Sequence, residues 1–534
     1  MAAPWNRSGP PGIGASRRRA TMTMPEVETA HHAASSMAKD MATWPTHRMS
    51  PDAALLPELD TINARVDDLV RNNGIAAGAE RTFVDNVVGP RITCKPNPDY
   101  VRLGKTSGWV DGWAREVEAE FRTFTDTDWF DAGLRYNFHV STRLQARMIA
   151  ATGEALALPL WTKRNGSLWN TCVQLVDPAR LSNPFGEAET TTFRGGIELD
   201  KVTTAATAYH IRKTHPGDAL GLFGGLSGAH DWERVPAYMP WGRRRVIHLF
   251  ESERVGQTRG KAVIASVARQ FKMFDHMNRE QLRLAVLNSL IFAALETPLN
   301  AEQIENIFGE SEKPMEAYQA SLDDWRIQMK GGSMVTLPPG TTMKPFAPNQ
   351  QMTGLDTFAT VMLRSIGAGL NMPYELVFRD FSKTNYSSAR ASLLEAWRYF
   401  ASVRQFIIDH WCSSIYDLWF EEACQRGHIP DCTPDDYYGN QIAWTRAKWI
   451  FAGRGWVDPL KEAKAATERL NSKISTLSDE CGEQGRDWRE QIDQDAREKA
   501  YQKQSYKALG LSWPPAQAAQ QPDVAEAPDE AIPA

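Results

Sequence analysis

The sequence has no apolar run long enough to cross a bilayer, and it has few cysteines for its length. No window approaches about 18 continuous apolar residues, so we expect no transmembrane helix and no membrane partner. The six cysteines form no Cys-x-x-Cys pair and have no histidine cluster beside them, which argues against a zinc finger or a thioredoxin-like site. We therefore expect reduced thiols, no metal site and no cofactor.

The chain also lacks the basic excess of a protein that grips nucleic acid. Its formal net charge is −5, from 60 Lys and Arg against 65 Asp and Glu. Affinity for nucleic acid comes largely from releasing counterions from the phosphates, and this requires clustered positive charge. If DNA is a partner, we expect its contacts to be local or transient.

Catalytic motifs are missing as well. The segment Gly256–Ala262, GQTRGKA, follows a strand-like run and precedes a long helix, as a phosphate-binding loop does. Such a loop needs four residues between its glycines and a Ser or Thr after the lysine, whereas here three residues intervene and Ala262 follows. No G-x-S-x-G or His-Glu-x-x-His motif occurs. We expect no ATP binding and no catalytic residue, and hence no enzyme.

Three weaker patterns favour surface structure over chemistry. Gly221–Gly228 is typical of a surface loop, and the three acids of residues 126–131 lack the Gly and the distal Glu of a calcium loop. The run Arg243–Arg245 leaves two interpretations. A solvated or ion-paired start of a strand is favoured over a contact with a phosphate or a neighbouring subunit.

At 534 residues with 42% apolar content, the chain is long enough for two or three domains and a large core. Composition predicts a disordered basic arm at 1–50 and a disordered acidic tail at 511–534. Helical periodicity appears at 59–88, 112–124 and 140–152, and five strand-like runs follow between Ala155 and Phe250. The fold class expected is α+β, mostly helical.

The longest helical pattern runs from Arg259 to Glu296, with no proline and one glycine. As a single helix it would span roughly 57 Å, at about 1.5 Å per residue, and helices of that length usually serve as struts or oligomer contacts. The rest of the chain predicts, in order, a helix at 315–329, a strand–turn–strand at 334–346, and helices at 355–370, 388–426 and 459–507.

Five separated segments resemble the lambda family of phage portal proteins. They include KTNYSSARASLLEAWRYF and GQTRG, and they keep the order and approximate spacing of the family. The segments are Asp52–Gly89, Val176–Pro184, Ile247–Gly260, Ser365–Phe400 and Leu460–Gln491. The least similar part is Leu299–Lys344.

The resemblance implies a portal-type fold and a role without catalysis. Portals of this family form a ring, usually of twelve copies, at one vertex of the capsid in the virion, after assembly in the host cytoplasm. Double-stranded DNA passes through the central channel, and the implied partners are the terminase large subunit, head-completion or adaptor proteins, and major capsid and scaffold proteins. The implied parts are an α/β wing at 51–258, stem helix 1 at 259–296, a small α/β clip at 297–350, stem helix 2 at 351–371, a channel loop at 372–387, a wing return helix at 388–458 and a helical crown at 459–510.

The channel loop is the candidate site. A tunnel in which DNA slides needs weak contacts that ignore sequence, and a ring of strongly basic loops would trap the phosphates. Neutral polar groups dominate this loop, and its two cations face one acid, Asp380. The residues expected to face DNA are Arg379, Ser382, Lys383, Thr384, Asn385, Tyr386 and Ser387.

Another interpretation of the same segment is a capped helix start, with Ser387 or Ser388 as the N-cap, and both interpretations can hold together. On the helix that follows, we expect Trp397 and Phe400 to be buried. Two further functional hypotheses remain. A packaging nuclease or ATPase would need a phosphate loop or a clustered acidic metal site, and neither is found. Another oligomeric capsid or scaffold protein would not need the long strut helices or the polar loop.

Overall fold

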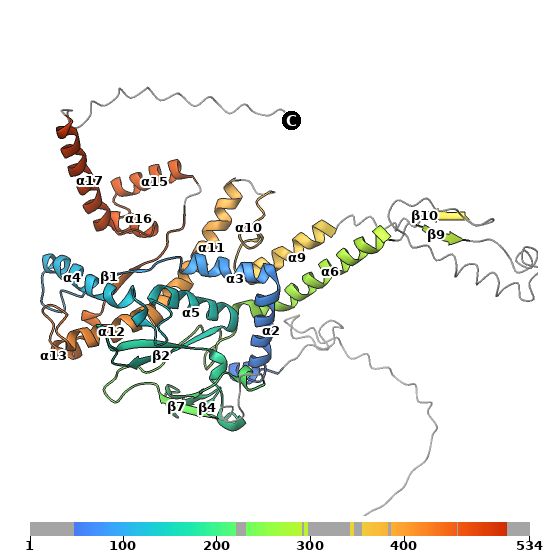
Figure 1. Cartoon of the computed structure of the whole chain (residues 1–534), viewed down its shortest axis with the longest axis horizontal. Helices are drawn as coiled ribbons and strands as arrows, with labels where there is room; N and C mark the ends of the chain where they lie inside the picture. Colours follow the sequence, from blue (N-terminus) through green and yellow to red (C-terminus); the bar gives the residue numbers. More distant parts are fainter. Residues whose placement is uncertain are drawn as a thin grey trace, which may run out of the picture. The chain divides into compact units, whose positions relative to one another are not determined.

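Helices dominate the architecture, with three small antiparallel sheets and a separate short strand pair, β9–β10, after the long helix α6 (Figure 1). The structure, a computed structural model, describes residues 47–220, 231–290, 293–296, 342–345, 355–382, 386–455 and 458–509. From Pro51 on, these residues belong to one compact unit. The predicted class, α+β and mostly helical, is confirmed.

The first helices are α1 (Pro51–Leu55), α2 (Leu59–Asn72), α3 (Gly74–Val87), α4 (Ser107–Thr125) and α5 (Phe138–Thr152). The helical pattern at 59–88 is therefore two helices. Asn73 separates them, because its backbone is extended (φ −108°, ψ 115°) and its side chain accepts hydrogen bonds from the amides of Ile75 and Ala76. This is the geometry of an N-cap, so the same residue ends α2 and starts α3.

All five predicted strands are present and fall into two sheets. The first sheet has the order β3-β2-β8, and the second has the order β4-β5-β6-β7. The pattern missed β7, whose sequence WERVP lacks clear alternation, and the two-stranded pair β1-β11. The strands are β1 (Thr93–Pro96), β2 (Glu154–Trp161), β3 (Thr171–Val176), β4 (Phe193–Arg194), β5 (Ile197–Leu199), β6 (Ala206–Arg212), β7 (Trp232–Pro236), β8 (Ile247–Phe250) and β11 (Ala447–Ile450).

The single helix predicted over 259–296 was too long. A 3₁₀ turn, η6 (Val263–Val267), leads into α6 (Ala268–Leu290), and β9 (Ala293–Glu296) follows. β9 pairs antiparallel with β10 (Thr342–Pro345), so a partner distant in sequence overrides the local helical pattern. The expected helix at 315–329 and the first strand of the 334–346 pattern lie outside the described residues.

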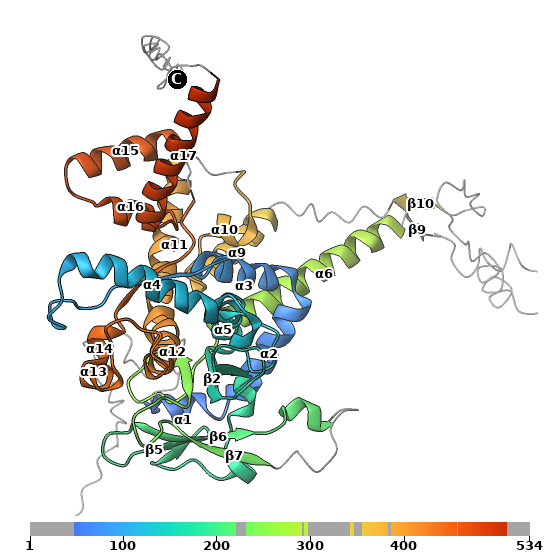
Figure 2. The same cartoon turned by 60° about the vertical axis from the view of Figure 1, so that its left-hand side comes forward.

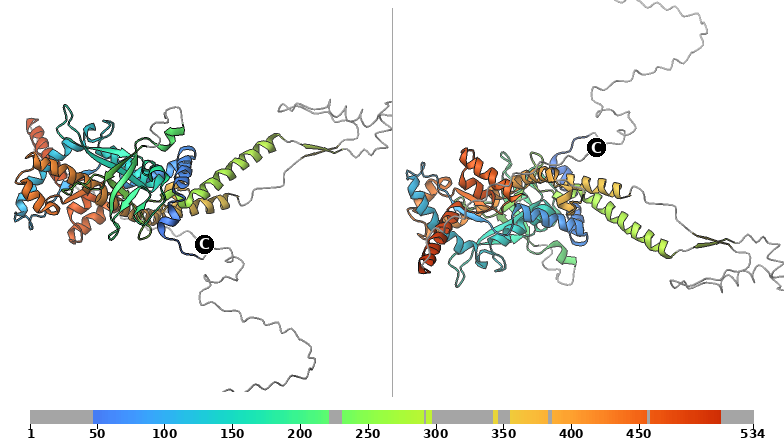
Figure 3. Two further views of the ribbon diagram at one scale, coloured as in Figure 1. Left: turned by 90° about the horizontal axis from the view of Figure 1, so that it is seen from below. Right: turned by 90° about the horizontal axis from the view of Figure 1, so that it is seen from above.

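α9 (Leu355–Gly369) confirms the helix predicted at 355–370, and it leaves the body of the unit beside α6 (Figure 3). The range 372–387 is not all loop, because it contains the helix α10 (Tyr374–Phe378) and the first residues of α11 (Tyr386–Ile407). α11 continues through a π-helical turn, η7 (Ile408–Cys412), into α12 (Ser413–Gln425). The range 388–458 is therefore not one helix, since it also holds α13 (Pro434–Gly439), α14 (Gln441–Trp444) and β11.

The last described helices are α15 (Pro459–Asn471), α16 (Leu477–Glu483) and α17 (Trp488–Ala508), which lie near one another in Figure 2. They confirm the helical region predicted from residue 459. Four short 3₁₀ turns complete the described elements: η2 (Asp128–Phe130), η3 (Pro178–Arg180), η4 (Pro184–Gly186) and η5 (Pro216–Leu220).

The main core joins α3, α4 and α5 to η7 and α12 and is rich in aromatic rings. Its largest fully buried side chains include Trp411, Trp419, Tyr416 and Phe400. The predicted burial of Phe400 is confirmed, whereas Trp397 is only partly buried at the edge of this core. A second, smaller core fills the space between the two sheets.

Candidate channel loop and its anchoring sites

The candidate loop begins at a sharp turn after α10. Arg379 is exposed and left-handed (φ 57°, ψ 29°), which ends the helix and redirects the chain. Asp380 then gathers three donors: the Tyr374 hydroxyl at 2.7 Å, the Ser382 amide at 3.1 Å and the Ser382 hydroxyl at 2.6 Å. The Ser382 side chain is thus engaged by Asp380, and the start of the loop is a structured turn.

The remaining predicted loop residues divide into two groups. Lys383, Thr384 and Asn385 lie outside the described residues. Tyr386 and Ser387 belong to the first turn of α11, so the helix begins earlier than predicted. The proposal of Ser387 or Ser388 as the N-cap was therefore wrong. Sequence reasoning also missed Phe381, whose side chain is half exposed in the turn.

The root of the loop is held by close packing of the end of α9 against η6 and against the turn that follows α9. A Cβ atom on Gly369 would lie 2.3 Å from Cγ1 of Val267, and one on Gly367 would lie 2.8 Å from the Met372 carbonyl oxygen. The Ser266 hydroxyl donates to the Gly369 carbonyl at 3.3 Å. These glycines looked like helix breakers in the sequence, and the structure shows that they permit the tight contact.

Arg404 anchors α11, the helix that follows the loop. Its guanidinium donates to the carbonyls of Asn86 and Val87, at 2.9 and 3.0 Å, and to that of Ala452 at 3.1 Å. It also lies over the Trp397 ring, with 4.8 Å to the centroid. Burial lowers the pKa of Arg404 to about 10, which leaves it charged at neutral pH. In the described part of the chain, the contacts of the Arg404 guanidinium are backbone carbonyls and the rings of Trp397 and Phe451.

Two of those carbonyls lie at the C-terminal end of α3, where the helix dipole concentrates negative charge. The third precedes the segment that leads to α15. One arginine therefore joins the loop-bearing helix α11, helix α3 and the chain that enters α15–α17. No sequence motif marks it, since its partners are main-chain atoms.

The GQTRG segment has a structural role at the root of α6. Nε of Arg259 donates to both carboxylate oxygens of Glu154 at 2.9 Å, and its Nη1 donates to the carbonyls of Leu181 and Gly195 at 2.8 and 2.9 Å. Nε2 of His248 bonds the same carboxylate at 3.0 Å. The side chains of Glu154 and Arg259 are 0% and 5% exposed.

Burial alone would raise the pKa of Glu154, but Arg259 and His248 outweigh it and lower the pKa to about 2. A Cβ atom on Gly260 would lie 2.1 Å from the Gly153 carbonyl oxygen and 2.8 Å from Cβ of Glu154, so the end of the GQTRG segment packs directly against the start of β2. Arg259, from the segment that resembles a phosphate-binding loop in sequence, therefore forms buried bonds that connect the two sheets near the start of η6.

Arg243 confirms the ion-paired interpretation of the basic run. It forms an ion pair with Glu421 of α12, and it donates to the Thr171 hydroxyl at 2.9 Å and the Leu418 carbonyl at 3.1 Å. Its side chain is largely buried, whereas the Arg244 guanidinium lies over the Tyr238 ring.

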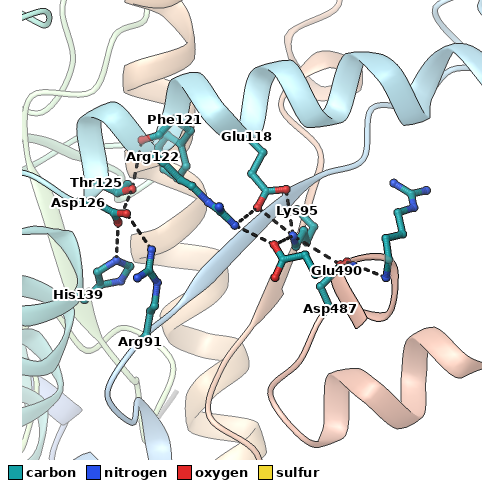
Figure 4. A network of polar contacts seen from close by, with 11 residues as sticks. Arg91, Lys95, Glu118, Phe121, Arg122, Thr125, Asp126, His139, Asp487 and Glu490 are labelled. Carbon is teal, nitrogen blue, oxygen red and sulfur yellow. Dashed lines mark hydrogen bonds and ion pairs between the residues drawn. The ribbon is translucent and has the colours of Figure 1, made fainter. Parts of the chain in front are cut away.

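Helix α17 contacts α4 and β1 through charged side chains (Figure 4). Nζ of Lys95 lies 2.9 Å from Oε1 of Glu118 on α4 and 2.9 Å from Oε1 of Glu490 on α17. Arg122 bonds the same two acids, at 2.6 and 2.9 Å. Burial would lower the pKa of Lys95, but its bonds to these acids raise it above 10.5.

No side chain of α15, α16 or α17 is buried. The close backbone contact of Gly453 with residues 484 and 485 supplements the ion pairs, because a Cβ atom on Gly453 would lie 2.5 Å from the carbonyl carbon of Gln484. Polar contacts rather than an apolar core therefore hold these helices in place.

Within the described ranges, no cluster of His, Cys, Asp and Glu is placed to bind a metal ion. Among the same residues, no helix has the length and apolarity that a membrane span requires.

Comparison with known proteins identifies the family. The family model described as phage portal protein, lambda family, matches residues 38–404. The chain belongs to this family. It is 32% identical over 492 residues to the portal protein of Escherichia phage N15, covering 89% of this chain and 90% of that protein. It is 31% identical over 507 residues to portal protein B of Escherichia phage lambda, covering 92% of each.

Among solved structures, the neck of an empty gene transfer agent particle matches at a TM-score of 0.43 and 9% identity, over 78% of this chain and 89% of that one. Portal proteins are structural components of the virion that form ring oligomers, and DNA passes through their vertex during packaging and ejection. This portal chain has the same role. The wing, stem, clip, channel-loop and crown boundaries, and the DNA-facing residues, remain predictions.

Proposed function

We propose that this portal subunit assembles into the twelvefold ring that the family resemblance implies, and that it conducts DNA without catalysing a reaction. In the proposed particle the terminase large subunit and later the head-completion or adaptor proteins dock on the ring, while major capsid and scaffold proteins surround it. We place assembly in the host cytoplasm and the finished ring at the vertex of the virion.

The observation that supports self-association is apolar surface on both stem helices. Leu282 of α6 is 68% exposed, and Phe358 and Val361 of α9 are 54% and 59% exposed. Side chains of this kind, gathered on helices that leave the body of the unit, mark a contact surface. In a ring each copy presents the same two helices to its neighbours, so a second copy is the proposed cover.

The proposed channel lining rests on the chemistry of the loop. Arg379 is exposed at the start of the loop, and Asp380 lies next to it and offsets its charge. Ser382, and the adjoining Lys383, Thr384, Asn385, Tyr386 and Ser387, add hydroxyls, an amide and one amine. Such a lining contacts the phosphate backbone weakly and without sequence preference, so DNA slides past it.

Negative-stain microscopy of the purified protein tests the ring. We expect rings with a central hole, and monomers or closed shells under assembly conditions would refute the portal assembly. Incubation with ATP tests the absence of catalysis, since turnover by the protein alone would indicate a packaging motor.

Replacing residues 379–387 with a Gly/Ser linker tests the loop. We expect intact rings that package or retain less DNA, because the lining changes while the stem surfaces do not. A matched control replaces the exposed turn 201–204 in the same way and should package normally. Normal packaging by the loop variant would show that these residues do not contact DNA.

A further inference from the structure

Two of the six cysteines touch each other in this structure. Cys424 lies in the last turn of α12 and Cys432 lies just before α13, and their Sγ atoms are 3.4 Å apart. Both thiols are free, and their residues are 2% and 8% exposed. A disulfide requires about 2.0 Å between the sulfurs, so a movement of little more than one ångström would join them.

The segment between the two cysteines can supply that movement. Its residues include Gly427 (φ 74°) and Asp431 (φ 54°), and the neighbours of Cys432 on both sides are exposed. The contact also makes the two thiols unequal. The hydrogen bond from the Cys432 thiol lowers the pKa of Cys424, while the pKa of Cys432 is raised. Cys424 is thus the better nucleophile of the two.

This segment also holds helix α4. The indole nitrogen of Trp113 donates to the Pro430 carbonyl at 2.9 Å, and that of Trp109 donates to Asp431 at 2.8 Å. A covalent bond at its base would therefore fix the contact between α12 and α4. The four other cysteines provide an internal comparison, because no sulfur–sulfur hydrogen bond joins any of them in the described part of the chain.

We propose that Cys424 and Cys432 are a redox pair that becomes a disulfide when the particle leaves the reducing cytoplasm. The timing rests on the proposed place of this chain in the virion, whereas the chemistry does not. Disulfides persist in extracellular and virion environments and are rare among cytosolic thiols.

With a peroxide as oxidant the reaction balances. The Cys424 thiolate attacks one peroxide oxygen, the O–O bond breaks, and a sulfenic acid and, after proton transfer, one water form. The Cys432 sulfur then attacks the sulfenic sulfur, the S–S bond forms, the S–O bond breaks, and a second water leaves. Two thiols and one hydrogen peroxide give one disulfide and two waters, and two electrons pass from sulfur to oxygen.

Peptide mapping of the native, full-length protein tests the proposal. After treatment with hydrogen peroxide, alkylation of free thiols and joint cleavage after Arg and Glu, Arg426 separates the two cysteines and Glu422 separates Cys424 from Cys412. We expect the peptide 423–426 linked to the peptide 427–446, with a mass lower by two hydrogen atoms and two fewer alkylated thiols. Dithiothreitol should reverse both changes.

Two variants sharpen the result. Cys432→Ser should abolish the linked peptide, whereas Cys481→Ser, which removes a partly exposed thiol elsewhere, should leave it unchanged. Hydrogen exchange of amides 427–432 should slow on oxidation of the wild type and stay unchanged in Cys432→Ser. Full alkylation of both cysteines after peroxide treatment, or a link from Cys424 to another cysteine, would overturn the pairing.

The timing has its own test. Released particles should carry the linked peptide, and assemblies taken from the cytoplasm under alkylation should not. A pair that oxidises in the purified protein but stays reduced in released particles overturns the timing. If Cys424 and Cys432 form the disulfide in a protein that forms no ring, the redox proposal is supported and the proposed portal assembly is refuted.

Discussion

Arg259→Leu should severely destabilise the packing of the two central sheets, because it leaves Glu154 charged and buried without its main partner. The carboxylate is fully buried, and the guanidinium supplies its three closest hydrogen bonds while also donating to the carbonyls of Leu181 and Gly195. Breaking a buried pair by removing one partner costs about 3–5 kcal/mol. Denaturant unfolding monitored by hydrogen exchange in β2 and β8 would measure this cost.

The pH dependence of the free energy of unfolding gives an independent measure of how much the Glu154–Arg259 pair stabilises the fold. In the folded protein the pKa of Glu154 is about 2, against an ordinary value of 4.5. A depressed folded pKa contributes stability that is present above pH 4.5 and is lost as pH falls towards 2. The shift corresponds to about 3 kcal/mol, which agrees in size with the cost of breaking the pair.

Without Arg259 the pKa shift of Glu154 should reverse its sign, and so should its effect on the pH dependence of stability. Burial then dominates and raises the pKa of Glu154, so the variant should gain stability relative to the wild type as pH falls. The double variant Arg259→Met with Glu154→Leu, which removes both charges, should recover much of the loss and show neither dependence. The reasoning is refuted if Arg259→Leu keeps wild-type stability, or if its loss is the same at pH 7 and pH 4.

Three further outcomes follow from the structure. Lys95→Ala should weaken the attachment of α17 by about 1 kcal/mol, a modest value because Glu490 is well exposed, and added salt should weaken it in the wild type too. If α17 were equally sensitive to protease in Lys95→Ala and in a Lys499→Ala control, this attachment would be refuted. Arg404→Lys should cost about 2 kcal/mol, because an amine cannot reach three carbonyls at once, and unchanged amide exchange in α11 would refute the anchoring role. Leu282→Asp should prevent ring formation, measured by sedimentation, while leaving the subunit folded, measured by circular dichroism. The control Val202→Asp, on an exposed turn, should assemble normally, and rings formed by Leu282→Asp would show that α6 makes no subunit contact.

Local sequence patterns determined the elements whose cause lies within a few residues. The apolar periodicity of α5 and α9 predicted helices close to their observed bounds, whereas α4 begins five residues earlier than predicted and the single helix predicted at 388–426 is formed by α11, η7 and α12 in succession. Short apolar or alternating runs found the strands of the first sheet. The same reasoning placed a polar loop around residues 382–387 and a helix after it, and the helix begins slightly earlier, at Tyr386. The similarity of several segments to a family supplied the functional role, which no single residue pattern contains.

Tertiary structure decided the features whose partners are far apart in the chain. Glu154 and Arg259 are 105 residues apart, and no local pattern shows that they form a buried pair. Likewise β9 becomes a strand because β10 pairs with it, Arg404 binds carbonyls more than 300 residues away, and Cys424 meets Cys432 because the segment after α12 turns back. Periodicity records which face of an element is apolar, whereas the choice of partner depends on packing of the whole chain, and so the anchors of the candidate loop appeared only in the folded molecule.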